Sequence, residues 1–186
     1  MNGARRPWQP TRLETAGTSP RSSFGKGAMT VLMSGPRGSV AYSRQPDAPA
    51  PVAADYIEFA AMDSTPRWSR EFVAKFLDRY TDYSASGLTE KAAVIVSELA
   101  TNTVEAARKL IRPTVVWLSV RLFHDHLLAE VIDSSPAVPV LLEEMDVFAE
   151  HGRGLHLVDA LSEGRWGWFR WPPPPGRKVA WCRLVT

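Results

Sequence analysis

The pattern of apolar and polar positions predicts a helix over residues 64–80, STPRWSREFVAKFLDRY. Four aromatic side chains recur there at every fourth position: Trp68, Phe72, Phe76 and Tyr80. This spacing places them on one wide apolar face of a helix. Thr65 suits the N-cap and Pro66 the first helical turn, where its missing N–H costs nothing.

The rest of the chain divides into two further helices and several strands. The pattern predicts a helix from about Thr89 to Leu110 and another from about Gly154 to Leu161. Runs rich in β-branched and aromatic residues predict strands. These runs are YIEFA (56–60), TVVWLSVRLF (114–123), LLAEVID (127–133), GRWGWFRW (164–171) and RKVAWCRLV (177–185). The last four form two hairpins, and a loop of about 18 residues, 134–151, separates the first hairpin from the third helix.

This order of elements does not alternate strand with helix, which argues against a doubly wound parallel sheet. We therefore expect an α+β fold. Its form would be a two-layer α/β sandwich, in which helices cover one face of a mostly antiparallel mixed sheet.

Composition separates the first 54 residues from the remainder. They carry seven Lys and Arg against Glu14 and Asp47, a net charge of +5, so the whole-chain charge of +2 leaves −3 for the rest. Proline, glycine and serine are frequent there, and little apolar surface offsets the entropy of ordering. We expect a disordered basic tail over residues 1–54 and a folded domain over 55–186. A basic arm for nucleic acid or an acidic partner is the alternative, but without interleaved aromatics direct nucleic-acid binding is not expected.

The sequence shows neither a membrane-spanning apolar run nor a secretory leader. No apolar run approaches the roughly 18 residues that span a bilayer, and no leader-like segment opens the chain. The single cysteine, Cys182, excludes an internal disulfide framework. We expect a soluble, cytoplasmic protein.

Candidate chemistry begins in VSELATNTVEAA (96–107), where Glu98 and Asn102 are four residues apart and project from one face of a helix. A carboxylate and an amide on adjacent turns suit a proton acceptor and a hard oxygen ligand for Mg²⁺. The same spacing is common on solvated helix surfaces, so spacing alone does not select between these readings.

Two further candidates lie at the ends of predicted elements. Asp133 ends a strand, where its carboxylate suits the amino group of a ligand or, equally, the start of a Ser-Pro turn. Gly152, Arg153 and Gly154 precede a helix whose free N–H groups and positive dipole end favour phosphate. The dinucleotide and phosphate-loop patterns are both incomplete here, so this stretch alone is also compatible with a plain turn.

Taken together, SELATN, VIDSSP and EHGRGLHLVDAL, in this order, resemble motifs of the histidine-kinase-like ATPase (GHKL) family. The likeness is to actinobacterial anti-sigma-factor serine/threonine kinase regulators and covers roughly Asp55 to Val185. It implies a Bergerat-type ATP-binding fold that holds Mg·ATP under a mobile lid.

The resemblance also implies a role for each candidate residue. Glu98 would be the catalytic base toward a substrate hydroxyl, Asn102 the Mg²⁺ ligand, and Asp133 the acceptor for the adenine amino group. The triphosphate would be wrapped by four consecutive residues: Gly152, Arg153, Gly154 and Leu155.

The function implied is phosphoryl transfer from ATP to an antagonist protein. Its partners would be a sigma factor, that antagonist, or both, with a second copy of the chain in a homodimer. Three positions depart from the family pattern: Ser135 in the first nucleotide box, Ala106 where a histidine is frequent, and Val179 where a threonine is frequent. These departures keep open an alternative, a non-catalytic ATP-dependent regulator that captures its partner.

Overall fold

The computed structural model describes residues 50–80, 87–111, 113–141, 153–170 and 177–186, and the backbone of two strands at 29–35 and 38–44. Seven strands form one sheet in the order β2-β1-β6-β7-β5-β4-β3, and every adjacent pair is antiparallel. The strands are β1 (Met29–Gly35), β2 (Gly38–Arg44), β3 (Ala53–Ala60), β4 (Val115–Leu122), β5 (His126–Asp133), β6 (Trp166–Arg170) and β7 (Lys178–Val185).

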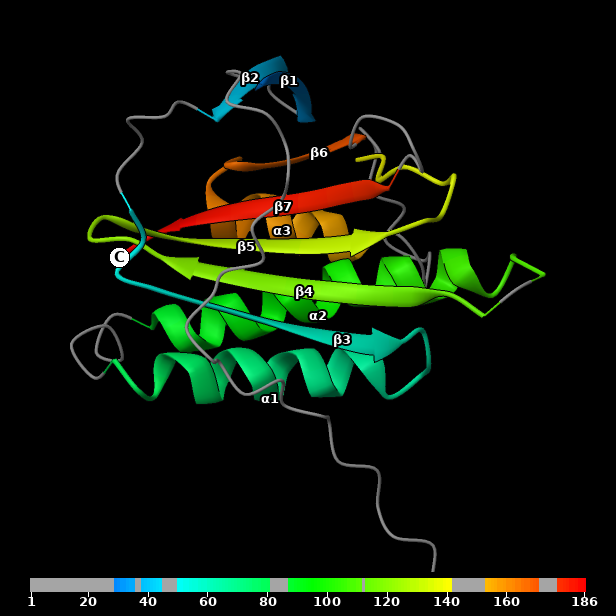
Figure 1. Ribbon diagram of the computed structural model, residues 1–186, viewed down its shortest axis with the longest axis horizontal. Helices are drawn as coiled ribbons and strands as arrows, with labels where there is room; N and C mark the ends of the chain where they lie inside the picture. The colour runs from blue at the N-terminus through cyan, green and yellow to red at the C-terminus, as the bar shows by residue number, and fades with distance from the viewer. Residues whose placement is uncertain are drawn as a thin grey trace, which may run out of the picture.

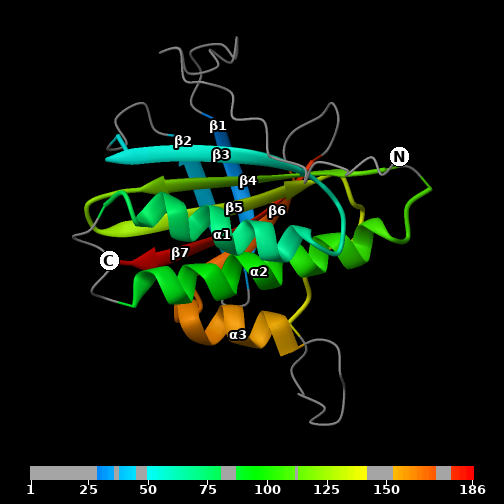
Figure 2. The ribbon, with the colours of Figure 1, turned by 90° about the horizontal axis from the view of Figure 1, so that it is seen from below.

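Three helices lie together on one face of this sheet (Figures 1 and 2). They are α1 (Thr65–Leu77), α2 (Leu88–Ala107) and α3 (Arg153–Ser162). The expected α+β class and two-layer α/β sandwich are therefore confirmed, with helices on one face. The sheet is more regular than the mixed sheet expected, since each described pairing is antiparallel.

The helix starts differ in detail from the sequence prediction. Thr65 is the first residue of α1 and makes no cap bond; its hydroxyl donates to the Ala60 carbonyl and accepts from the Met62 N–H, which ties α1 to the end of β3. Helix α2 begins at Leu88 after Gly87, whose φ of 67° lies in the left-handed region that favours glycine. Thr89 therefore falls inside the helix rather than at its cap, and α2 ends at Ala107 instead of Leu110.

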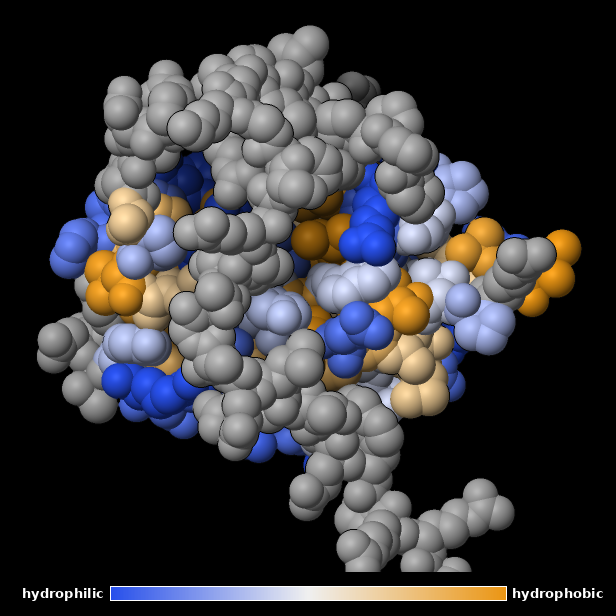
Figure 3. All heavy atoms as spheres, in the orientation of Figure 1, coloured by the Kyte–Doolittle hydropathy of each residue, from blue (hydrophilic) through white to orange (hydrophobic). Residues whose placement is uncertain are grey.

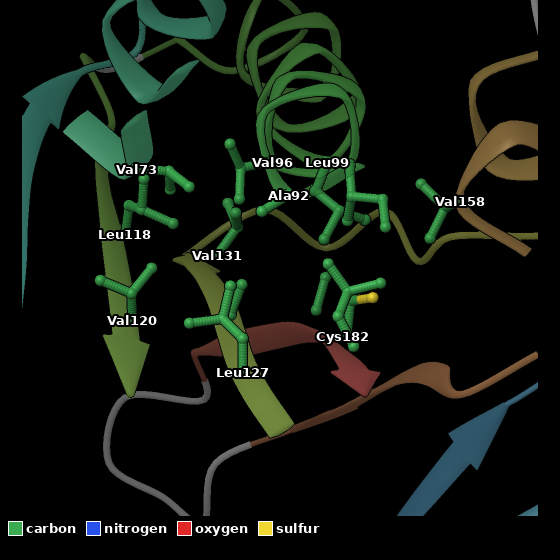
Figure 4. Close-up of a cluster of buried hydrophobic side chains, with 14 of the residues drawn as sticks. Val73, Ala92, Val96, Leu99, Leu118, Val120, Leu127, Val131, Val158 and Cys182 are labelled. Atoms are coloured by element: carbon green, nitrogen blue, oxygen red, sulfur yellow. The ribbon is translucent and has the colours of Figure 1, made fainter. Parts of the chain in front are cut away.

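The hydrophobic core fills the space between the two layers. Alternate residues of β4 and β5 point to the helices, and Figure 4 shows them meeting side chains of α1 and α2. The buried members from these elements include Val73, Ile95, Val96, Leu99, Val116, Leu118, Val120, Leu127 and Val131. Burying an aliphatic side chain of this size contributes about 1.5–3 kcal/mol. This packing holds α2 in a fixed position over the end of β5.

A smaller cluster lies on the sheet face turned away from the helices. Phe169 and Val179 are buried there, and Ile132 and Trp181 pack against them. Figure 3 shows this face, on which described apolar and polar side chains alternate. Trp166 belongs instead to the main core on the helix side.

The structure places two strands within the segment whose composition predicts disorder. β1 pairs with β2 along its length and with β6 at Ser34 and Trp168. The signal is a short apolar run, TVLM (30–33), which the average composition of 54 residues conceals. β3 already begins at Ala53, two residues before the expected domain start. Residues 1–28, 36–37 and 45–49 of the predicted tail lie outside the described residues. None of the described helices is both long enough and apolar enough to cross a membrane.

Candidate functional site

Helix α2 carries Glu98, Asn102 and Thr103 at its centre, where apolar neighbours on both sides are packed into the core. Glu98 and Asn102 are partly buried on successive turns, and Thr103 is buried. They are not a solvated helix surface, which was the alternative reading of their spacing. The two residues project instead toward other elements of the fold.

Asp133, the last residue of β5, is completely buried and is surrounded by hydrogen-bond donors. Its Oδ1 accepts the Ser135 N–H at 2.6 Å, and its Oδ2 accepts the Thr103 hydroxyl at 3.1 Å. The Ser135 bond is the turn-starting interaction that the sequence also suggested. Because Thr103 comes from α2, the same carboxylate links the strand end to the helix.

Lys178 is the third partner of Asp133, and sequence reasoning missed it. It is the first residue of β7 and stands directly opposite Asp133 in the antiparallel register. Its Nζ lies 3.1 Å from Asp133 Oδ2 and donates to the Ala137 carbonyl at 2.8 Å. The side chains of the pair are only 4% and 0% exposed. Such a buried ion pair persists only when further hydrogen bonds satisfy both groups.

Gly154 lies against Glu98 at the start of α3. A Cβ on Gly154 would overlap Glu98 Oε2 and approach Glu98 Cδ to 3.3 Å. The glycine therefore permits close contact between α3 and the Glu98 side chain. The first turn of a helix carries a partial positive charge, which favours a carboxylate or a phosphate at this place.

The other residues of the predicted glycine turn are placed differently. Arg153 is exposed and is the first residue of α3. Leu155 is only 7% exposed and its side chain is part of the main core. Only its backbone could therefore contact a phosphate. Gly152 lies outside the described residues, as do residues 142–151 of the predicted loop 134–151.

One short stretch of α2 thus brings the predicted motifs together. Glu98 touches Gly154, and Thr103 bonds to Asp133. These two α2 residues are five positions apart, which corresponds to about 7.5 Å along a helix axis. Asn102 lies between them in the sequence of α2, one turn after Glu98 and one residue before Thr103.

The Asn102 side chain carries an unsatisfied polar atom. Its amide nitrogen is buried and has no hydrogen-bond partner in the part of the chain that the structure describes. The nitrogen and oxygen of a side-chain amide are told apart by their hydrogen bonds. Without such a bond, the Asn102 amide can be turned so that its oxygen takes the place of its nitrogen. A buried amide of this kind suits a ligand contact, and its oxygen suits Mg²⁺.

The chemistry of the donor set limits how a metal would be held. Within the part of the chain that the structure describes, no group of three His, Cys, Asp or Glu side chains is arranged to bind a metal ion. An Mg²⁺ ion at Asn102 would therefore take its remaining ligands from phosphate oxygens and water, which is how Mg²⁺ commonly binds with nucleotides.

The three departures from the family pattern fall in different places. Ser135 is buried, and its hydroxyl accepts the Ala137 N–H at 3.1 Å, which stiffens the turn after Asp133. Ala106 is partly buried on α2. Val179 belongs to the cluster on the opposite sheet face, so its side chain does not reach Asp133. The β7 residue that does reach it is Lys178.

No protein-family model matches the chain, and no curated protein matches it in sequence.

Proposed function

We propose that this protein binds Mg·ATP between the centre of α2, the end of β5 and the start of α3, and that it acts as an ATP-dependent regulator. One observation carries the proposal. A six-residue span of α2, from Glu98 to Thr103, contacts both Asp133 and Gly154, and the buried amide nitrogen of Asn102 within that span lacks a partner among the described residues.

Each part of ATP has a matching group in this region. The adenine amino group would donate to Asp133, and the phosphates would lie at the start of α3, against Arg153, Gly154 and the backbone of Leu155. Asn102 would ligate Mg²⁺, which neutralises charge on the phosphates when bound. The residue types suit these roles, because a buried carboxylate reads an amino group and a glycine lets phosphate approach closely.

The activity we favour is serine/threonine protein kinase activity toward an antagonist protein, within a sigma-factor regulatory system. Glu98 would orient the acceptor hydroxyl and accept its proton as the oxygen attacks the γ-phosphorus and the bond to ADP breaks. Positioning and charge stabilisation would supply most of the rate enhancement. We also propose that the regulator works as a homodimer in the cytoplasm.

A second candidate is a regulator that binds ATP without transferring phosphate. It is favoured by the position of Glu98, whose carboxylate is directed against Gly154 in the space that a phosphate would approach. In this case ATP stabilises a conformation that captures the sigma factor or another partner, and Glu98 has no chemical role.

A titration of the purified chain with Mg·ATP, followed by calorimetry and by the melting temperature, tests nucleotide binding. We expect saturable binding that Asn102→Ala weakens at least tenfold. Glu105→Ala is the matched control, since Glu105 is exposed on the same helix. Unaltered binding in Asn102→Ala would exclude the proposed site.

Transfer of labelled phosphate to the antagonist separates the two candidates. For the kinase, Glu98→Gln keeps ATP binding but lowers transfer by about 10²–10⁴-fold, the usual contribution of a general base. For the non-catalytic regulator, neither wild type nor Glu98→Gln labels the antagonist, while both still bind ATP.

A further inference from the structure

Lys178 is a buried cation that the proposed ATP site leaves without a role. Its ammonium group has three N–H donors; one donates to the Ala137 carbonyl, and the Asp133 carboxylate lies 3.1 Å from Nζ as its counter-ion. These are its two polar contacts with the described residues, fewer than its three donors could make, and the side chain is only 4% exposed. A buried donor left unpaired is costly, so such a group commonly meets a ligand or water.

The Asp133 carboxylate has complementary capacity. It offers about four acceptor sites, two on each oxygen. Oδ2 is contacted by Thr103 and Lys178, whereas Oδ1 accepts one hydrogen bond from the described residues, that of the Ser135 N–H. The Asp133–Lys178 pair therefore keeps one acceptor and one donor on neighbouring groups, 3.1 Å apart at their point of contact.

We infer that Lys178 is a second base-reading residue, which donates to the adenine ring nitrogen next to the amino group held by Asp133. The inference rests on the proposed ATP site. Adenine carries its amino donor between two ring acceptors, N1 and N7, so a donor beside Asp133 meets one of them. The ammonium group makes this a charge-assisted bond, which is stronger than a neutral one.

Lys178 also has a structural role, and a test must distinguish the loss of this role from the loss of a hydrogen bond to adenine. Lys178 also holds the turn after β5 through the Ala137 carbonyl. Arg170, at the end of β6, holds the same turn by donating to the carbonyls of Ser135 at 3.4 Å and Pro136 at 2.6 Å. Arg170 does not contact Asp133 in any of these bonds, so Arg170→Met is a matched control for loosening of the turn.

Analogues that each lack one ring nitrogen test the inference on the wild-type protein. Mg·ATP, Mg·1-deaza-ATP and Mg·7-deaza-ATP are titrated against the full chain by calorimetry. We expect one analogue to bind about 10- to 100-fold more weakly than ATP, the range for a hydrogen bond to a charged group. The other analogue should bind like ATP. Equal affinity for all three would overturn the inference.

Variants then assign the effect to Lys178. In Lys178→Met, the analogue that binds wild type more weakly should bind as tightly as ATP, because the donor is gone. In Arg170→Met, the ratio of the two affinities should stay at the wild-type value. A ratio that persists in Lys178→Met contradicts the assignment. Since Lys178→Met leaves Asp133 buried without its cation, the neutral pair Asp133→Asn with Lys178→Met serves if the single variant does not fold.

Titrations with other nucleotides distinguish failure of the Lys178 role from failure of the proposed ATP site. Guanine and cytosine also carry a donor beside an acceptor, so GTP and CTP are titrated beside ATP. Binding of either in place of ATP, or no binding of ATP at all, rejects the ATP site itself. ATP binding that is indifferent to the ring nitrogens and to Lys178 rejects only the base-reading role.

Discussion

Two groups of polar residues contact the same stretch of α2, and they differ in how far the fold satisfies them. The first, the Asp133 cluster, consists of Thr103, Asp133, Ser135 and Lys178, all buried and linked by hydrogen bonds or the ion pair. The second, the Glu98 cluster, consists of Glu98, Asn102 and Gly154, all partly buried. The Asn102 amide nitrogen of this second cluster has no hydrogen-bond partner among the residues that the structure describes.

The difference follows from the free-energy cost of leaving each group unpaired in the ligand-free protein. A charge buried without a partner costs several kcal/mol, so Asp133 requires Lys178 and its other donors in the folded chain itself. Glu98 retains contact with solvent, and Asn102 is neutral, so the fold tolerates their incomplete pairing. We therefore expect changes in the Asp133 cluster to lower stability, and changes in the Glu98 cluster to alter binding.

The largest expected effect is that of Asp133→Ala. Removal of the carboxylate leaves the Lys178 ammonium buried without a counter-ion, and loss of one partner of such a pair costs about 3–5 kcal/mol. Urea unfolding followed by tryptophan fluorescence measures the loss. Asp133→Asn with Lys178→Met, which removes both charges, should restore part of it. A loss below about 1 kcal/mol for Asp133→Ala would remove the contrast between the clusters.

Asn102→Ala should leave the stability of the ligand-free protein intact and weaken its stabilisation by ATP. Without nucleotide its free energy of unfolding should equal the wild-type value or exceed it by up to about 1 kcal/mol, since alanine favours the helix and no hydrogen bond is lost. With ATP at a hundred times its Kd, wild type should gain about 2.7 kcal/mol. Most of that gain should be missing in the variant. Thermal unfolding with and without Mg·ATP gives both numbers, and a destabilised apo variant would contradict the expectation.

Gly154→Ala tests the contact between α3 and Glu98 and should have a smaller effect. The new Cβ displaces the Glu98 carboxylate, while alanine gains up to about 1 kcal/mol of helix propensity over glycine. Because the displaced group is the end of a flexible chain, the net change in stability should stay within about 1 kcal/mol. In the Glu98→Ala background the same substitution should be clearly stabilising. A double-mutant cycle measures this coupling, and additive effects would show that the two residues do not interact.

The last prediction concerns Cys182, which is buried in the main core and has its effect only at high pH. Burial raises the pKa of the Cys182 thiol to about 12, partly opposed by a hydrogen bond with Ser162. The folded state thus disfavours the thiolate. Stability is unaffected below pH 9 and falls as pH rises from about 9 toward 12, because only the unfolded chain ionises there.

Alkylation of this cysteine at pH 8 should accordingly be slow and limited by opening of the structure. Asp133→Ala should speed it, whereas Asn102→Ala without nucleotide should not. Mass spectrometry after timed exposure to iodoacetamide measures the rate. Fast labelling of the native wild type would show that the core around β7 opens readily.

Local sequence patterns were sufficient for the fold class and for the helices and strands from residue 53 onward. The strict alternation in β4 specifies the strand and the face it buries. The fourfold spacing of aromatics specifies helix α1, which ends at Leu77, but of these aromatics only Phe76 is fully buried, and Trp68, Phe72 and Tyr80 pack against the core from its edge. Asp133 at a strand end, and Glu98 and Asn102 on one helix face, follow from the same local rules. The strands at 29–44 escaped notice because their apolar runs are short and lie in a segment of different average composition.

The state of each polar group was decided by the tertiary structure alone. Lys178 looks like an ordinary strand-start lysine until the antiparallel register of β5 and β7 sets it opposite Asp133. The contact of Glu98 with Gly154 and the unpaired amide of Asn102 likewise depend on how α2 and α3 are placed. Periodicity reports which face of an element is buried. Which charges meet there depends on pairings between residues distant in the chain, and these are set by packing of the whole domain.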